Sequence, residues 1–383
     1  MNIQINPQLL NWAIERSMKS ADELLRKFPN LKNWQNESKS PTLKQLEKFA
    51  KATFTPIGML FLQTPPKEVL PIDDFRTFQD DDFNRPSANL LDTIYASQQR
   101  QEWYQTYCRQ NGFDKQSVAG KWTIRDDPED VAKEICQIFS FHHNYSSWQN
   151  ALSDRTALIE KQGILVMSSG VALGNTHRSL DLNEFRGFAL SDEYAPVIFI
   201  NAKDSIAARS FTLMHELAHI VIAQNGVSNT NSYNENTNSV EKWCDKVAAE
   251  ILVPSQEFKQ NYQYNLNSLG EDLTYFSKFF KVSTLVILGR IYDLDYLDKR
   301  NFWRLFREEK AKLIKILQQQ KTQSKGGNYY NTKPASVSKL FVKTITASTL
   351  EGSTLYRDAM QLLNIKSIKT FNNITEQIHP WSV

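Results

Sequence analysis

The first 64 residues place apolar side chains at helical spacing, and this pattern predicts a small helical domain. Apolar residues recur every three or four positions in "PQLLNWAIERS" and "SADELLRKF". Ser20, with Glu23 three residues later, is typical of a helix start. A further helix is predicted in "SPTLKQLEKFAKAT", because Leu43, Leu46 and Phe49 then share one face. Residues 65–85 begin in a proline-rich stretch and are predicted to be a linker.

Residues 86–300 combine helical patterns with a few short apolar runs. Helices are predicted over residues 86–112 and 127–140. Buried strands are predicted in three runs that are rich in branched and aromatic residues, namely Ile164–Met167, "RGFALS" and "APVIFIN". Helical spacing returns in "FTLMHELAHIVI" and in "EKWCDKVAAEILVP", which Pro254 ends. The Asn-rich stretch between them, Gln224–Val240, is expected to be a loop.

The order of these elements predicts an α+β fold. A helix pair turning at Val282-Ser283 follows the apolar core segments, and residues 301–383 carry a charged helix over 301–325 and a mostly helical tail. Helices thus stand before and after a small cluster of strands. We expect a core over 86–300, with helical additions at 1–64 and 301–383.

Composition is that of an ordinary globular protein. Of the 383 residues, 41% are apolar and 23% charged, and the net charge of +3 is too small to indicate a nucleic-acid binder by itself. The three cysteines, Cys108, Cys136 and Cys244, form no CxxC pair, which favours a reducing compartment. No apolar run is long enough to span a membrane and no leader pattern begins the chain, so a cytoplasmic protein is expected.

One helix carries polar groups where a buried helix should have none. His215 and His219 stand four residues apart, about 40° apart around a helix axis, so both imidazoles can reach one point. Two neutral imidazoles suit a zinc ion. Glu216 is offset by about 100° from His215 and can take a proton from water in an open metal position. The pattern H-E-x-x-H therefore predicts a catalytic zinc site.

A third ligand is expected from the following helix, which offers three carboxylates. Glu241 and Asp245 are spaced i, i+4 and share a face, and Glu250 lies near the end of the helix. We select Glu241 as the ligand, which leaves Asp245 to accept the second N–H of an imidazole. Glu250 is the main rival for the metal, and Cys244 is close enough in sequence to close the site as a fourth ligand.

These stretches resemble the ImmA/IrrE-type (M78-like) metallopeptidases. The resemblance rests on "FTLMHELAHIVI" and "EKWCDKVAAEILVP", and it extends over about residues 160–300 to include "IFIN" and "FFKVSTLVILGRIY". It implies a small-sheet, zincin-like core, Zn2+ held by His215, His219 and Glu241, and Glu216 as general base. Asp245 stands where family members often carry Asn or Asp. Cleavage of a specific repressor or antitoxin, in a stress, mobile-element or toxin–antitoxin circuit, is also implied.

The expected reaction needs a bound peptide and an oxyanion donor. An extended substrate is expected beside an edge strand near Ala195–Asn201. The candidate oxyanion donors are His177, Arg186, Tyr194 and Tyr233, and the sequence does not choose among them.

The N-terminal segment resembles a helix-turn-helix of the phage-repressor (XRE) type. The resemblance rests on "WQNESKSPTLKQLEKFA", and residues 15–51 hold nine Lys or Arg against five Asp or Glu, a surplus that favours phosphates. Pro29 shortens the expected recognition helix. DNA contact through residues 7–62 therefore competes with a role in protein contact, and Trp12 and Trp34 are predicted to be core anchors.

The C-terminal tail offers a second candidate contact surface. Leu355, Ala359 and Leu362–Leu363 share a helical face that either packs on the core or docks a toxin-like partner, and part of the tail resembles tails of family members encoded beside such proteins. Three functions follow from the whole sequence. The first is a zinc peptidase, and the second is a DNA-binding regulator or antitoxin whose metal site is structural or inactive. The third is a peptidase held inactive until stress supplies zinc or exposes its cleft, which the sequence does not separate from the first.

Overall fold

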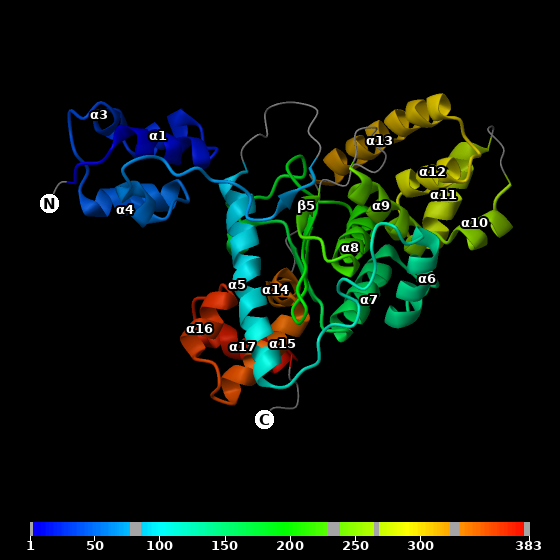
Figure 1. Cartoon of the computed structure of the whole chain (residues 1–383). Coiled ribbons are helices and arrows are strands. Elements are labelled where there is room, and N and C mark those ends of the chain that lie inside the picture. The colour runs from blue at the N-terminus through cyan, green and yellow to red at the C-terminus, as the bar shows by residue number, and fades with distance from the viewer. Residues whose placement is uncertain (1–2, 77–85, 229–237, 264–267, 322–328, 379–383) are drawn as a thin grey trace. The chain divides into compact units, whose positions relative to one another are not determined.

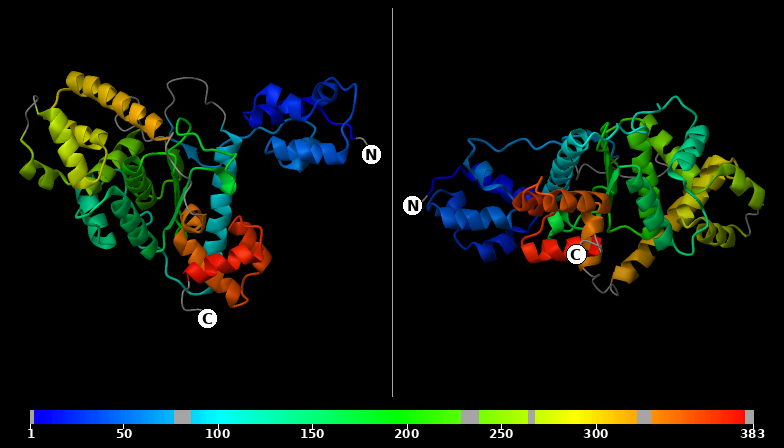
Figure 2. Two further views of the ribbon diagram at one scale, coloured as in Figure 1. Left: turned by 180° about the vertical axis from the view of Figure 1, so that it is seen from behind. Right: turned by 90° about the horizontal axis from the view of Figure 1, so that it is seen from below.

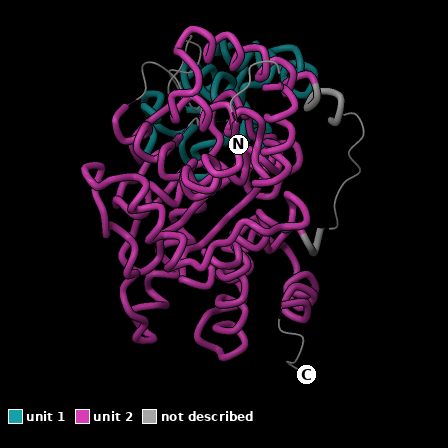
Figure 3. Tube along the Cα trace, turned by 90° about the vertical axis from the view of Figure 1, so that its right-hand side faces the viewer, with its two compact units in different colours: residues 1–71, 78–94 teal, residues 72–77, 95–383 magenta. Residues whose placement is uncertain are grey.

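The computed structural model describes residues 3–76, 86–228, 238–263, 268–321 and 329–378. The chain divides into two compact units, coloured separately in Figure 3. The N-terminal unit comprises residues 1–71 and 78–94, and the main unit comprises residues 72–77 and 95–383. The short segment 72–77 thus belongs to a different unit from the residues on both sides of it.

The N-terminal unit is built from short helices around two tryptophans. Its elements are α1 (Pro7–Arg16), α2 (Ala21–Lys27), α3 (Leu31–Gln35), α4 (Leu43–Ala52), the 3-10 helix η1 (Ile57–Phe61) and the start of α5 (Ala88–Gln110). Ser20 caps α2 by accepting from the backbone N–H of Glu23, as predicted. Trp12 and Trp34 lie in the core with Phe49, which confirms them as core anchors. α3 has only five residues, which is short for a recognition helix.

The main unit contains a mixed five-stranded sheet. Its strands are β1 (Asp73–Asp74), β2 (Leu165–Ser169), β3 (Gly187–Leu190), β4 (Val197–Asn201) and β5 (Gly226–Ser228). Their order is β1-β5-β3-β4-β2. β3 is antiparallel to both β4 and β5, whereas β2 is parallel to β4 and β1 is parallel to β5. The three predicted strands are confirmed to within two residues, and the α+β class is confirmed.

Two expectations about the strands are wrong. Ala195–Asn201 was expected to lie beside a sheet edge, but β4 pairs with both β2 and β3 and is internal. Gln224–Val240 was expected to be a loop, but Gly226–Ser228 form β5, and α9 (Ser239–Leu252) has begun before Val240. Residues 229–237 of that stretch lie outside the described residues. β1 falls within the predicted linker, whose residues 77–85 are likewise outside the described residues.

Helices cover both faces of the sheet (Figures 1 and 2). α8 (Ile206–Val221) packs on β3 and β4, while α14 (Tyr329–Val337) and α15 (Lys339–Leu350) pack against β2. Strand residues therefore alternate between two buried environments: Ile198 and Ile200 join the core around α8, and Phe199 stacks on Phe188. This explains why the strands read as continuous apolar runs.

The remaining helices complete the main unit. They are α6 (Pro128–Phe139), α7 (Trp148–Lys161), α10 (Ser255–Asn261), α11 (Leu269–Phe280), α12 (Thr284–Asp293), α13 (Lys299–Lys321), α16 (Tyr356–Leu362) and α17 (Ile368–Ile378), with a 3-10 turn η3 (Ala172–Gly174). The predicted turn between paired helices is confirmed, since Ser283 caps α12 by accepting from the N–H of Val286. Among the described residues, no helix is both long and apolar enough to cross a membrane.

The C-terminal helices are tied into the main unit. Glu160, at the end of α7, accepts hydrogen bonds from the Ser338 hydroxyl at 2.6 Å and from the Leu340 N–H at 3.3 Å. On the tail face singled out above, Ala359 and Leu363 are buried and Leu355 is 63% exposed. The buried members pack within the chain itself, and docking of a toxin-like partner through this region stays a prediction.

Candidate metal centre

α8 carries its polar side chains into the interior of the main unit. The helix begins at a capped end, where Ser205 accepts from the N–H of Ala208 at 3.2 Å. Apolar side chains anchor it on the sheet and on α9, with which it makes extensive contact. His215, Glu216 and His219 have no exposed surface at all. Buried polar groups of this kind need partners or a metal.

α9 supplies the partner that the two histidines face. The Nε2 atoms of His215 and His219 lie 3.1 Å apart. The Glu241 carboxylate, at the start of α9, lies 3.3 Å from Nε2 of His215 and 2.8 Å from Nε2 of His219. Two imidazole nitrogens and the Glu241 carboxylate, whose Oε2 faces His215 and whose Oε1 faces His219, therefore converge on one place.

This donor set fits a zinc ion. Ligands held about 2.0–2.1 Å from a tetrahedral zinc lie about 3.3 Å from one another. Here the imidazole nitrogens are 3.1 Å apart, and each lies within 3.3 Å of an oxygen of the Glu241 carboxylate. Within the described part of the chain, this trio is the one group of His, Cys, Asp or Glu side chains whose ligand atoms come close enough to hold a metal. Three protein ligands leave one position open, as in catalytic rather than structural zinc sites.

Asp245 lies one helical turn beyond Glu241, behind the first histidine. Its Oδ1 is 2.9 Å from Nδ1 of His215, the ring nitrogen that faces away from the cluster. A carboxylate in this position holds a ligand imidazole with Nε2 free for a metal. Glu241 and Asp245 thus contact opposite nitrogens of one ring, which their shared face of α9 allows.

The cluster places ionisable side chains in the protein interior, where burial makes their charged forms unfavourable. Burial alone would raise the pKa of Glu241, but His215 and hydrogen bonds from both imidazoles outweigh it and lower the pKa of Glu241 to about 2. Burial likewise disfavours the His215 imidazolium, but Glu241 and Asp245 raise the pKa of His215 well above its ordinary value. Burial lowers the pKa of His219. These shifts favour an ion pair between His215 and Glu241 in the metal-free cluster.

Glu216 points toward the sheet, on which it depends for its position. The Ser228 hydroxyl, on β5, donates a hydrogen bond to Oε1 of Glu216. Gly187 on β3 leaves room for this carboxylate, because a Cβ there would lie 2.6 Å from Oε1. Burial raises the pKa of Glu216 to about 8, although His215 and the Ser228 hydroxyl oppose the shift. Within the described residues, Oε2 of Glu216 has no hydrogen-bond partner.

An aromatic ring covers the second histidine. The Phe75 ring, directly after β1, stacks on the His219 imidazole with centroids 5.3 Å apart and planes 11° apart. Sequence reasoning missed Phe75 and Ser228, because each reaches the site through strand pairing with distant residues. The dipeptide Asn225-Gly226 is a turn signal that could have indicated the start of β5.

The rival ligands lie elsewhere. Glu250 forms an ion pair with Arg290 at 3.0 Å and accepts from the Ser255 N–H at 2.8 Å, at the start of α10. It is buried rather than solvated. Cys244 packs in the apolar core. Neither belongs to the group of side chains able to hold a metal.

The three candidate oxyanion donors that the structure describes lie in different settings. Arg186 lies next to Gly187 but is paired with Asp204. The Tyr194 ring lies under the guanidinium of Arg109, and His177 is exposed. Tyr233 lies outside the described residues.

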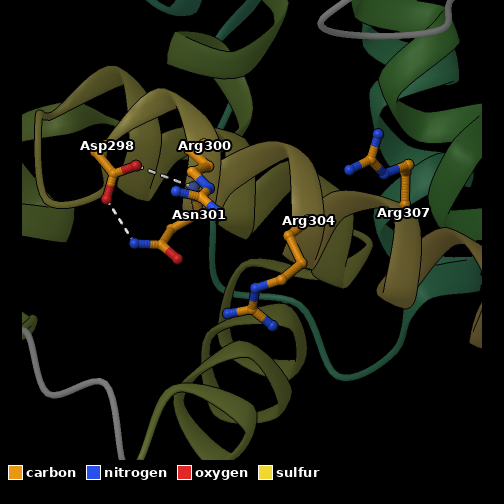
Figure 4. A pocket seen from close by; sticks show the side chains of 5 residues that line it. All are labelled: Asp298, Arg300, Asn301, Arg304 and Arg307. Atoms are coloured by element: carbon orange, nitrogen blue, oxygen red, sulfur yellow. Dashed lines mark hydrogen bonds between the residues drawn. The ribbon is translucent and has the colours of Figure 1, made fainter.

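A surface hollow at the start of α13 is distinct from the metal centre (Figure 4). It is lined by Asp298, Arg300, Asn301, Arg304 and Arg307. Asp298 accepts from the backbone N–H and the side-chain amide of Asn301, which caps the helix start. None of the residues of the metal centre lines it.

Comparison with known families agrees with this geometry. Residues 159–292 match the Peptidase_M78 family model, described as an IrrE N-terminal-like domain. Residues 337–377, which include α15 and α16, match a domain of unknown function, DUF8813. No curated protein matches the chain. The M78 match spans β2 to α12, and so it contains every residue of the metal cluster. Residues 159–292 are therefore similar to the IrrE N-terminal-like domain of the M78 peptidases, in agreement with the resemblance of this segment to the ImmA/IrrE-type family.

Proposed function

We propose that this protein is a zinc-dependent metallo-endopeptidase that cleaves a specific regulatory protein, a repressor or an antitoxin, in a stress, mobile-element or toxin–antitoxin circuit. The observation that carries the proposal is the convergence of the His215, His219 and Glu241 donor atoms, all within 4.8 Å of one another, with Glu216 buried beside them. A structural zinc site has no use for such a glutamate.

Each residue of the metal centre has its own role in the proposed peptide hydrolysis. Zinc held by His215, His219 and Glu241 would polarise a peptide carbonyl and lower the pKa of a water molecule. Glu216 accepts the proton of the attacking water and passes it to the leaving amine. A bound cation would favour the charged form of Glu216 and so oppose the effect of burial on its pKa. Asp245 keeps the His215 ring in the tautomer that a metal requires.

The burial of the site supports a specific substrate. General digestion needs a cleft that many peptides can enter, whereas His215, Glu216 and His219 are each 0% exposed. A site this closed suits a cognate partner whose binding rearranges the protein. The class of partner, a repressor or antitoxin, rests on the resemblance of residues 159–292 to the ImmA/IrrE-type peptidases.

The test is Glu216→Gln. This variant keeps the ligands, so zinc should remain bound at one equivalent while cleavage of the cognate partner disappears. Co-expression with each neighbouring gene product would find that partner as a fragment that a chelator abolishes. Glu102→Gln, an exposed substitution on α5 with the same change of charge, is the matched control and should cleave normally. Cleavage by Glu216→Gln would refute the role of Glu216.

A second candidate function is a DNA-binding regulator or antitoxin with an inactive or structural metal site. The full burial of His215 and His219 also suits a metal that only stabilises the fold. DNA contact would use residues 7–62, where basic side chains exceed acidic ones. This alternative predicts that zinc removal unfolds the main unit and that no partner is cleaved.

A further inference from the structure

Residues 72–76, which we call the strap, lie across the metal centre. Within the strap, β1 pairs with β5 in the register Asp73 to Gly226 and Asp74 to Val227. The N–H of Phe75 then donates to the carbonyl oxygen of Val227 at 3.0 Å. These bonds occupy the outer edge of β5, next to the residue, Ser228, that holds Glu216. Without the strap, β5 would be the edge of the sheet.

The ring of Phe75 fits a place shaped for it. It stacks on His219 on one side, and it lies so close to the backbone of β5 that a Cβ on Gly226 would come within 2.2 Å of its Cε2 atom. Gly226 has no positive φ, so the backbone conformation does not require glycine at this position. The contact with Phe75 is the reason that we find for a glycine here.

An arginine fixes the other end of the strap. Arg76 forms two bonds of 2.7 Å to the Asp74 carboxylate, and its Nη1 lies 3.7 Å from the buried carboxylate of Glu184, which precedes β3. The Arg76 side chain is only 2% exposed. The strap is therefore held by main-chain pairing, by an aromatic stack and by a buried ion pair.

We propose that the strap occupies the edge of β5 where a substrate would bind, and that it closes the metal centre until it is displaced. A protein substrate then enters as an extended segment that pairs with β5, and an aromatic side chain in the place of Phe75 suits the surface of His219 and Gly226. This inference builds on the proposed peptidase function, whose active site it describes. It replaces β4 by β5 as the strand that receives the peptide.

The connectivity of the chain suits a regulated release. The described residues on both sides of the strap, up to Pro71 and over 86–94, belong to the N-terminal unit. A partner that binds the N-terminal unit therefore binds residues that are linked to the strap on both sides. Such a partner would change the fraction of molecules in which the strap is in place, so that closure is reversible.

The test measures access to His219 without relying on catalysis. Metal-free full-length protein is treated with diethyl pyrocarbonate, which modifies accessible, uncharged imidazoles, and each histidine is quantified by mass spectrometry. We expect Phe75→Ala to speed modification of His219 by about tenfold, because the stack and its burial are lost. Gly226→Ala should act in the same direction, since its Cβ displaces the ring. The exposed His177 reports reagent activity within the same sample.

A matched control is available in Phe141, a half-buried ring that stacks on Phe139 at 5.3 Å. Phe141→Ala should leave the His219 rate unchanged. The inference is overturned if His219 of the unaltered protein reacts as fast as His177, or if neither strap variant accelerates it. Far-ultraviolet circular dichroism and an unchanged His177 rate separate opening of the strap from unfolding.

Cleavage by the zinc-loaded variants separates this inference from the proposed function. Faster His219 modification together with faster cleavage of the cognate partner supports both. Faster modification with no cleavage by any form supports the strap and refutes the peptidase. Cleavage by the unaltered protein with equal His219 rates in all variants supports the peptidase and refutes the strap.

Discussion

The Ser228 hydroxyl donates a hydrogen bond to the Glu216 carboxylate. Ser228 lies on β5, the strand that directly follows α8, and so β5 holds a glutamate of the preceding helix in position. The bond favours the charged form of Glu216, against the burial that raises its pKa to about 8. Removing the hydroxyl should therefore leave Glu216 protonated over a wider range of pH.

Ser228→Ala should shift the acidic limb of the cleavage profile to higher pH. At neutral pH the rate should fall about tenfold, because one pKa unit is a tenfold change in the charged fraction. The measurement is kcat/KM against pH. Ser277→Ala removes another buried hydroxyl, which bonds to the carbonyl of Thr274, and should leave the limb in place. An unmoved limb in Ser228→Ala would contradict this account of Glu216.

Asp245→Asn should weaken zinc binding without removing a ligand. The carboxylate that orients His215 becomes an uncharged amide, and changes of this kind cost about 10–100-fold in metal affinity. Competition with a chromophoric chelator measures the affinity, and saturating zinc should restore one equivalent. Asp130→Asn, an exposed change in the first turn of α6, serves as control. If both variants bind zinc equally well, Asp245 does not orient the ligand.

The metal-free protein should lose stability as pH rises. Glu216 has a folded pKa of about 8 and an ordinary unfolded value near 4.5, so the folded state holds its proton more tightly. Its contribution is complete below the unfolded pKa and is lost as pH rises through about 8, by about 5 kcal/mol at most. Glu216→Gln cannot titrate and should lack this slope. Urea unfolding at pH 5 and pH 8 measures it, and parallel slopes in the two proteins would refute it.

Gly187→Ala should destabilise the main unit. The new Cβ would lie 2.6 Å from Glu216 Oε1 and 2.9 Å from the carbonyl oxygen of Phe199, so backbone as well as side chain must move. Overpacking of this kind costs about 1–3 kcal/mol. Gly270→Ala, which meets no atom within 4 Å, is the control and should be neutral or slightly stabilising. Both can be measured by denaturant unfolding, and a neutral Gly187→Ala would contradict the close approach.

Prediction from the sequence was most successful where all the residues concerned lie in one helix or strand. His215, Glu216 and His219 share a single helix, so their spacing alone predicted how they face each other. The three longer strands were recognisable because helices cover both faces and make them uniformly apolar. The choice between Glu241 and Asp245 was harder, since both share one face of α9, and the structure brings both to His215.

Prediction failed where a residue reaches the site through pairing between distant segments. β1 and β5 have two and three residues, too few to display alternation, and β1 consists of two aspartates. Without these strands, β4 could be taken for an edge, and neither Ser228 nor Phe75 could be assigned to the site. The helical N-terminal unit shows the converse limit. Its helices and core were predictable from local pattern, but a DNA-binding role depends on a surface that this pattern does not define.

The path of the chain around β1 has a mechanical consequence. Because β1 lies within the chain and not at a terminus, the displacement proposed above would need no free end to pass through the fold. Opening and closing can therefore repeat many times with no peptide bond cut in this chain, unlike a zymogen, whose activation is spent after one use.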